Sequence, residues 1–176
     1  KHEWKNQYLI TYVTYQLSRT FKPQLDYGNI RSQLEQRGIT EAQLTADQLR
    51  DVIIDIRQSK LPDPVVMGNA GSFFMNPIVD ADTFATLKAA HSNLRYFEVT
   101  GDDGKVGYKI PAGWMIDQCG WKGRSLGRAG VYDKQALILV NRGGATGQEV
   151  VDLMHAVQHD VKKEFGLDLK PEVNII

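Results

Sequence analysis

The chain has 176 residues, and its 21 lysine and arginine residues equal its 21 aspartate and glutamate residues in number, so its formal net charge is zero. This balance gives no overall field that would attract nucleic acid or an anionic membrane surface. The single cysteine, Cys119, excludes an internal disulfide and fits a reducing compartment. No apolar run approaches the roughly 18 residues of a membrane span. We therefore expect a cytoplasmic protein without nucleic acid or membrane partners.

The first third of the chain predicts one strand and one helix. Residues 8–17, YLITYVTYQL, are rich in tyrosine and β-branched residues, which predicts a strand. Because this strand lies so near the first residue, we expect the chain to be cut from a longer protein. Thr45 and Gln48 have capping-box spacing, and apolar residues recur behind them with helical period, which predicts a helix over residues 46–58. The prolines of KLPDP, residues 60–64, end this helix and mark a domain junction.

The stretch GNAGSFFMNP, residues 68–77, predicts a tight turn that leads into a buried strand. Gly68 and Gly71 admit positive φ, whereas the two phenylalanines require burial. Ser72 lies at the junction. Its hydroxyl either bonds within the turn, which is the common case, or points at a bound group, and spacing alone leaves both interpretations open.

The next segment predicts a helix followed by a hairpin. Asp80 or Asp82 caps a helix that ends near Asn93. RYFEV and KVGYKI flank the turn GDDG, which is typical of two antiparallel strands.

The last third of the chain predicts two helices and two strands. Pro111 and Gly120 bracket a short helix, and residues 136–141, ALILVN, form a strand buried on both faces. A Thr146 and Glu149 capping box starts a long helix that ends at Gly166, and a short edge strand follows. Strands and helices of this kind, with hairpins, indicate an α+β fold.

Few side chains stand out as candidates for chemistry. His155 and His159 lie four residues apart on the long helix, but without a matching ligand cluster we expect no metal site. Residues 120–130, GWKGRSLGRAG, interleave glycines with Lys122, Arg124 and Arg128, which suits a phosphate. A glycine-rich turn with surface charges explains the same pattern.

Three long motifs resemble one known family. KLPDP with GNAGSFFMNP, then IPAGWMIDQCGWKGRSLGRAGVYDKQALILVN, and finally KPEV occur together and in order. In this combination the chain resembles the UDP-N-acetylenolpyruvoylglucosamine reductase family, flavoenzymes of peptidoglycan precursor synthesis in bacteria. The resemblance implies that NADPH reduces FAD and that UDP-N-acetylglucosamine enolpyruvate then accepts a hydride.

The resemblance also implies a division into domains. Residues 1–61 and 167–176 would be the carboxy-terminal part of an FAD-binding α+β domain, contributing strands and a helix. Residues 62–166 would be the substrate-binding domain, with a small antiparallel or mixed sheet and helices. Most FAD contacts would lie upstream of residue 1, so we expect the chain to be inactive by itself.

The same resemblance implies roles for individual residues. Ser72 would be the proton donor of the reaction, and Glu172 would hydrogen-bond or protonate the developing enediolate. Arg57 and Gly71 would lie near the flavin. Met75 stands where relatives commonly have lysine. The residues implied in binding the uridine nucleotide are Lys60, Asn76, Tyr96, Lys122 and Gln135.

Two other functions fit part of this pattern. A non-enzymatic nucleotide-sugar binding module would use the basic loop without Ser72. A flavin oxidase of the same fold type would use oxygen as its electron acceptor.

Overall fold

The computed structural model describes residues 7–101 and 104–175. Its helices and two antiparallel sheets confirm the predicted α+β class. The contacts divide the chain into two compact units, Lys1–Ile56 and Arg57–Ile176. The division of the chain into flavin-binding and substrate-binding domains, inferred from the resemblance, stays a prediction.

The first unit is built around short helices. These are α1 (Ile30–Gln36), the 3-10 turn η1 (Glu41–Gln43) and α2 (Ala46–Lys60), which continues past the end of the unit. The predicted capping box of α2 is confirmed, because the Thr45 N–H donates to Gln48 Oε1 at 2.9 Å and the Gln48 N–H donates to Thr45 Oγ1 at 3.2 Å. The small apolar core of the unit consists of Leu25, Ile30, Leu34, Leu44 and Val52.

The predicted strand over residues 8–17 is wrong. No strand of the described chain includes these residues, and their large side chains face solvent, with Tyr12 at 91% and Leu17 at 85% exposure. A β-strand needs a neighbouring strand to pair its N–H and C=O groups, and β-propensity measures how well side chains fit a half-buried pleated surface. Within the described residues this segment has the composition of a strand but no sheet to join.

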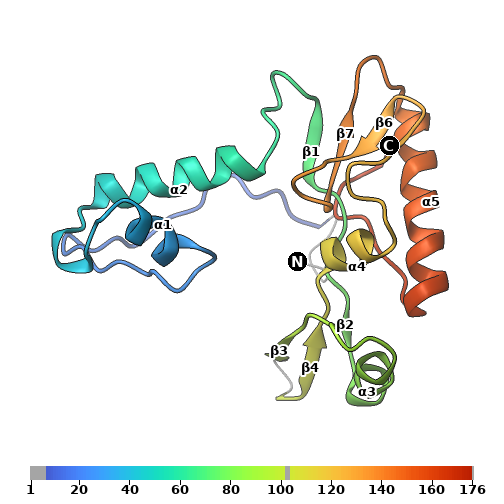
Figure 1. Cartoon of the computed structure of the whole chain (residues 1–176), viewed down its shortest axis with the longest axis horizontal. Helices are drawn as coiled ribbons and strands as arrows, with labels where there is room; N and C mark the ends of the chain where they lie inside the picture. Colours follow the sequence, from blue (N-terminus) through green and yellow to red (C-terminus); the bar gives the residue numbers. More distant parts are fainter. Residues whose placement is uncertain (1–6, 102–103, 176) are drawn as a thin grey trace. The chain divides into compact units, whose positions relative to one another are not determined.

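The second unit contains both sheets (Figure 1). The predicted hairpin of RYFEV and KVGYKI is confirmed as the antiparallel pair β3 (Phe97–Thr100) and β4 (Val106–Lys109), although Asp102 and Asp103 of its turn lie outside the described residues. The four-stranded sheet has the order β1 (Asn69–Ser72), β7 (Ile138–Asn141), β6 (Ala129–Val131) and β5 (Ser125–Leu126). The three-stranded sheet has the order β2 (Ile78–Val79), β4 (Val106–Lys109) and β3 (Phe97–Thr100).

Three helices pack with these sheets. Asp80 caps α3 (Ala81–Ala90) by accepting from the Thr83 N–H at 2.8 Å. α4 (Ala112–Gln118) begins one residue later than predicted, because Pro111 occupies the N-cap position. α5 (Gly147–Phe165) has the predicted Thr146 and Glu149 capping box, and Gly166 ends it with φ of 69°. Figure 1 shows α5 lying along the four-stranded sheet.

The carboxy-terminal segment pairs with the chain that follows β1. Phe74 forms a single antiparallel bridge with Pro171, where a short edge strand was expected. Proline has no N–H for a ladder, so pairing at this point is limited to the bonds of its neighbours. Among residues 7–101 and 104–175, every helix is too short or too polar to traverse a bilayer.

Candidate functional site

Ser72 is the last residue of β1, and it is exposed. The turn geometry that its neighbours predict is confirmed at Gly71, which has φ of +71° and no atom within 4 Å of the place where a Cβ would stand. Positive φ at this position favours glycine. Gly71 therefore leaves open space directly beside the serine.

The main chain of Phe73 forms hydrogen bonds to two different segments of the chain. Its N–H donates to the Leu137 carbonyl at 2.9 Å, and its carbonyl accepts from the Glu172 N–H at 2.8 Å. The Met75 N–H donates to the Lys170 carbonyl at 2.9 Å, so the pairing continues past the Phe74 bridge. Glu172 is therefore held beside the residue that follows Ser72. The structure brings the two predicted catalytic residues to the same end of β1.

A pocket of about 540 Å³ lies next to this region. Leu137, which bonds to Phe73, is one of its lining residues, so the pocket adjoins the Ser72 turn. Three of the five predicted nucleotide-binding residues line it together: Asn76, Lys122 and Gln135. They come from the segment after β1, the loop after α4 and the loop between β6 and β7. These loops are far apart in sequence, and the fold brings them to one cavity.

Asn76 is held in place by the start of α4. Its side-chain Oδ1 accepts a hydrogen bond from the Ala112 N–H at 2.8 Å. The N-cap residue Pro111 makes no side-chain cap, so Asn76 supplies the acceptor that the helix lacks locally. This bond uses the carbonyl end of the amide, and its NH₂ group is a donor for a ligand.

Gln135 is positioned by a close approach of α4 to the β6–β7 loop. Its Oε1 accepts from the Leu137 N–H at 3.4 Å. A Cβ added at Gly113 would stand 3.2 Å from that same oxygen, which is tighter than most real contacts. Gly113 therefore lets the helix and the loop meet at the pocket wall.

Arg57, predicted to lie near the flavin, and Lys60, predicted to bind the nucleotide, do not line this pocket. Both residues are in the last turn of α2. Arg57 lines a separate hollow of about 440 Å³ with the segment from Leu61 to Pro64. Their roles toward flavin and nucleotide stay predictions.

Tyr96 also lies away from the pocket lining. Its ring is 4.6 Å from the Phe84 ring centroid and 6.1 Å from that of Tyr108, and Lys88 Nζ lies 5.5 Å from it. Its chain neighbours Arg95 and Phe97 do line the pocket. Alternate residues of extended chain point to opposite sides, so the pocket receives the residues on either side of Tyr96.

The basic loop after α4 divides its cations between different tasks. Arg128 forms a two-pronged ion pair with Glu149, with Nε to Oε1 at 3.1 Å and Nη2 to Oε2 at 2.9 Å. The Arg124 guanidinium lies 4.7 Å from the Trp121 ring centroid. Only Lys122 of these three lines the pocket. For Arg124 and Arg128, the structure therefore favours charges that belong to a glycine-rich turn over cations that bind a phosphate.

Glu149 is the most perturbed carboxyl of this region. The Arg128 hydrogen bond is the main cause that lowers its pKa to about 2, and the Thr146 N–H of the capping box adds to it. A carboxylate at the first turn of α5 also complements the helix dipole. This ion pair ties the glycine-rich loop to α5.

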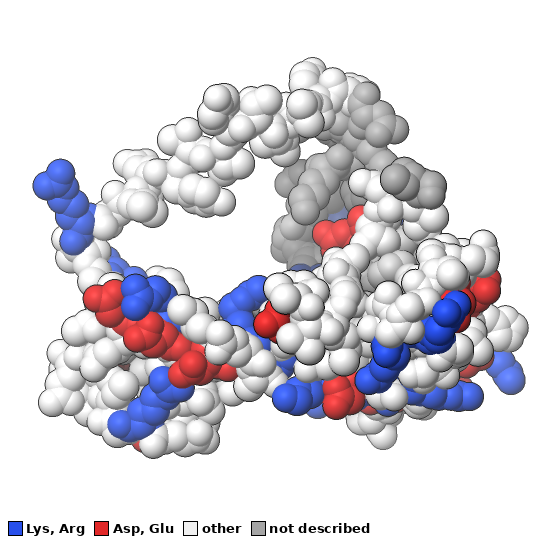
Figure 2. Space-filling model, turned by 90° about the horizontal axis from the view of Figure 1, so that it is seen from above, with Lys and Arg blue, Asp and Glu red and all other residues white. Residues whose placement is uncertain are grey.

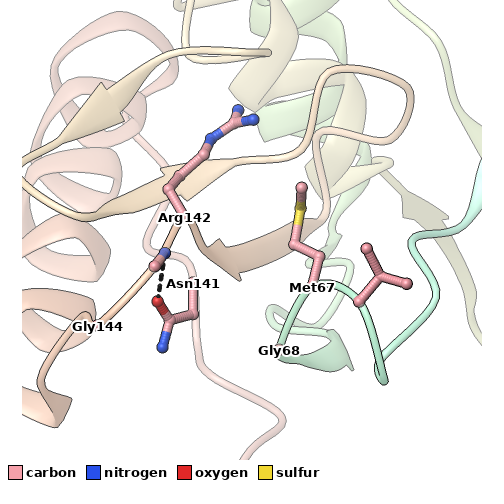
Figure 3. A pocket seen from close by; sticks show the side chains of 7 residues that line it. Met67, Gly68, Asn141, Arg142 and Gly144 are labelled. Atoms are coloured by element: carbon pink, nitrogen blue, oxygen red, sulfur yellow. Dashed lines mark hydrogen bonds between the residues drawn. The ribbon is translucent and has the colours of Figure 1, made fainter.

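A second hollow, of about 310 Å³, lies between the start of β1 and the loop after β7 (Figure 3). Its polar groups bond within the protein. Asn141 Oδ1 accepts from the Gly143 N–H at 2.8 Å and from the Ala145 N–H at 3.0 Å. Arg142 Nη2 donates to the Val131 carbonyl at 3.1 Å. These bonds hold the loop in place, which makes this hollow the weaker ligand site.

Other reactive side chains of the described residues do not gather into a second site. The described residues contain no group of three or more metal-ligating side chains, and His155 and His159 are both exposed. Burial, with the charges of Asp160 and Glu164, raises the pKa of the Cys119 thiol to about 11. A thiol with this pKa is protonated at neutral pH and a poor nucleophile.

Comparison with known proteins agrees with this organisation. Residues 63–176 match the family model described as "UDP-N-acetylenolpyruvoylglucosamine reductase, C-terminal domain". The chain is 54% identical over 167 residues to the UDP-N-acetylenolpyruvoylglucosamine reductase of Bacteroides fragilis and 46% identical over 172 residues to that of Burkholderia ambifaria. These alignments cover 95% and 98% of this chain but 48% of each relative, so the chain spans about half the length of the curated relatives it matches. The chain therefore belongs to the UDP-N-acetylenolpyruvoylglucosamine reductase family, and the site described above lies in its C-terminal domain.

Proposed function

We propose that this chain is the nucleotide-binding part of an NADPH- and FAD-dependent reductase that converts UDP-N-acetylglucosamine enolpyruvate to UDP-N-acetylmuramate in peptidoglycan precursor synthesis. One observation carries the proposal: Phe73 bonds to Glu172 on one side and to Leu137 of the pocket on the other. It supports a site in which Ser72 and Glu172 act on a substrate whose nucleotide occupies the neighbouring pocket.

The open space beside Ser72 is compatible with a bound flavin. Gly71 has open space in front of it, so a planar ring could approach the backbone closely there. FAD, when bound, would supply the hydride that adds to the terminal carbon of the enolpyruvyl group. In this proposal Gly71 and Arg57 are the residues of this chain that contact it.

Ser72 would complete the reduction by moving a proton. As the terminal carbon gains a hydride, the electron pair of the double bond moves toward the substrate carboxylate and forms an enediolate. The Ser72 hydroxyl then delivers its proton to the adjacent carbon. A hydroxyl is a weak acid at neutral pH, so this step depends on its placement by the short β1 turn.

Glu172, with its carboxyl group protonated, would donate a hydrogen bond or its proton to the developing enediolate oxygen. The bond from its N–H to the Phe73 carbonyl fixes its main chain beside the Ser72 turn. A group fixed where charge develops lowers the barrier, because it need not reorganise during the reaction.

The test is the Ser72→Ala variant of the full-length protein that contains this chain, with the two half-reactions followed separately. NADPH should reduce the flavin at the unaltered rate, whereas reduction of the enolpyruvyl nucleotide should fall by about 10²–10⁴-fold. Ser92→Ala, which changes an exposed serine after α3, is the matched control and should leave both rates unaltered.

The same experiment separates the other two functions. Unaltered substrate reduction in Ser72→Ala would refute the role of the serine and favour a binding module. Flavin reoxidation by oxygen that outpaces reoxidation by the enolpyruvyl nucleotide in the unaltered protein would favour an oxidase.

A further inference from the structure

The lining of the 540 Å³ pocket includes two cations that the sequence motifs do not single out. Arg95 lies two residues before β3, and Lys134 lies in the β6–β7 loop beside Gln135. With Lys122 they bring three positive charges from three separate segments to one cavity. Figure 2 shows cationic and anionic side chains interspersed on the visible face of the molecule.

The charges in this pocket are not balanced internally. Asp117 is its only described acidic lining residue, and its Oδ2 lies 3.6 Å from Lys122 Nζ. Neither Arg95 nor Lys134 forms an ion pair with any residue in the described ranges 7–101 and 104–175. Three positive charges and one negative charge leave an excess of two positive charges on the pocket walls.

This excess selects the chemical class of the ligand. A nucleoside diphosphate ester carries one negative charge on each phosphate, and lysine and arginine bind phosphate through charge-assisted hydrogen bonds. The remaining lining offers amide groups at Asn76 and Gln135 and apolar surface at Trp114 and Phe97, which suits a base and a ribose. A ligand with a single carboxylate would carry one negative charge, which one of these cations would be enough to neutralise.

We propose that Arg95 and Lys134 bind the diphosphate of the nucleotide together with Lys122, an inference that rests on the nucleotide site proposed above. The fold directs Arg95 inward because Tyr96 is held in the ring cluster with Phe84 and Tyr108. The residue before Tyr96 therefore faces the opposite side, where the pocket lies. Lys134 lies beside Gln135, which lines the same pocket and whose Oε1 accepts from the Leu137 N–H.

Calorimetric titration of the 176-residue chain with UDP, UMP and uridine tests this assignment. Arg95→Ala and Lys134→Ala should each weaken UDP binding about tenfold, which is the usual loss for a charge-assisted hydrogen bond, and leave uridine binding unaltered. The loss should be smaller for UMP. Both side chains are exposed, so the variants should fold as the original chain does, which circular dichroism verifies. Arg124→Ala removes a cation outside the pocket and is the matched control.

Each other outcome has a distinct meaning. Unaltered UDP affinity in both variants, while the original chain binds UDP, would overturn the assignment and leave the nucleotide site intact. Equal losses for UDP and uridine would place Arg95 or Lys134 on the nucleoside, which also overturns it. Failure of the original chain to bind UDP, UMP or uridine would overturn the nucleotide site and this inference together.

Discussion

The two polar ends of the Asn76 side chain allow its contact with α4 to be tested separately from its proposed role in nucleotide binding. Its Oδ1 accepts from the Ala112 N–H at 2.8 Å, and Ala112 is fully buried, so Asn76→Ala leaves a buried donor without this partner. An unsatisfied buried donor or a lost helix cap costs about 1–2 kcal/mol. Asn76→Asp keeps the acceptor and adds a charge that the helix N-terminus tolerates, so the free energy of unfolding should change by less than about 0.5 kcal/mol.

Binding should follow the opposite order. Aspartate loses the NH₂ donor and adds a negative charge to a pocket that we propose holds a diphosphate, so Asn76→Asp should weaken UDP binding by about tenfold or more. Asn76→Ala adds no charge and should weaken it less. Urea unfolding measures the stability and calorimetric titration measures the affinity. Equal unfolding free energies of Asn76→Ala and the original chain would refute the cap, and stronger UDP binding by Asn76→Asp would refute the placement of the phosphates.

Three further changes test other parts of the structure. Gly130→Ala would place a Cβ 2.7 Å from Ser125 Oγ and 2.8 Å from Arg142 Nε, so urea unfolding should show a loss of stability of about 1–3 kcal/mol. The control Gly147→Ala, which has no atom within 4 Å of the added Cβ, should show almost no loss. Equal losses in the two variants would contradict the close packing at Gly130. Because the folded-state pKa of Glu149 is lowered from 4.5 to about 2, its stabilisation is present above about pH 4.5 and is lost as the pH falls toward 2. Glu149→Gln should therefore flatten the decline of melting temperature between pH 5 and pH 2, and an unaltered decline would count against the ion pair with Arg128. Tyr12→Lys should lower the binding of a hydrophobic dye by the 176-residue chain, because Tyr12 is 91% exposed, whereas Thr11→Lys should change it less; unaltered dye binding would mean that the segment is covered.

The helices that the sequence predicts correctly carry their own signals. α2 and α5 each begin with a capping box and present an apolar stripe, so neighbouring residues determine both the start and the buried face. α1 was not predicted, and its seven residues carry few local signals, with no acidic residue in the first turn and no basic residue in the last. Residues 8–17 show the converse, because strand-forming residues need a partner that local sequence cannot supply.

The features of the candidate site also differ in whether local sequence or contacts between distant segments determine them. The GNAGSFF motif predicts a turn in which Gly68 and Gly71 admit positive φ, and of the two only Gly71 adopts it. The position of Glu172 depends on its bond to Phe73, which lies almost one hundred residues earlier in the chain. Arg95 lies outside the quoted motifs and Lys134 lies within the second of them, and only the meeting of separate loops places both in one pocket. Tyr96 shows how a shift of one residue along an extended segment changes which side chain faces a ligand.

The most direct measurement is amide chemical-shift mapping of the isotopically labelled 176-residue chain during titration with UDP. The proposed nucleotide site predicts that the largest changes occur around Asn76, Lys122 and Gln135, with further changes at Arg95 and Lys134. Changes centred on Gly143 and Gly144 would instead assign the nucleotide to the smaller hollow beside β1. That result, or the absence of any change at saturating UDP, would contradict the site proposed here.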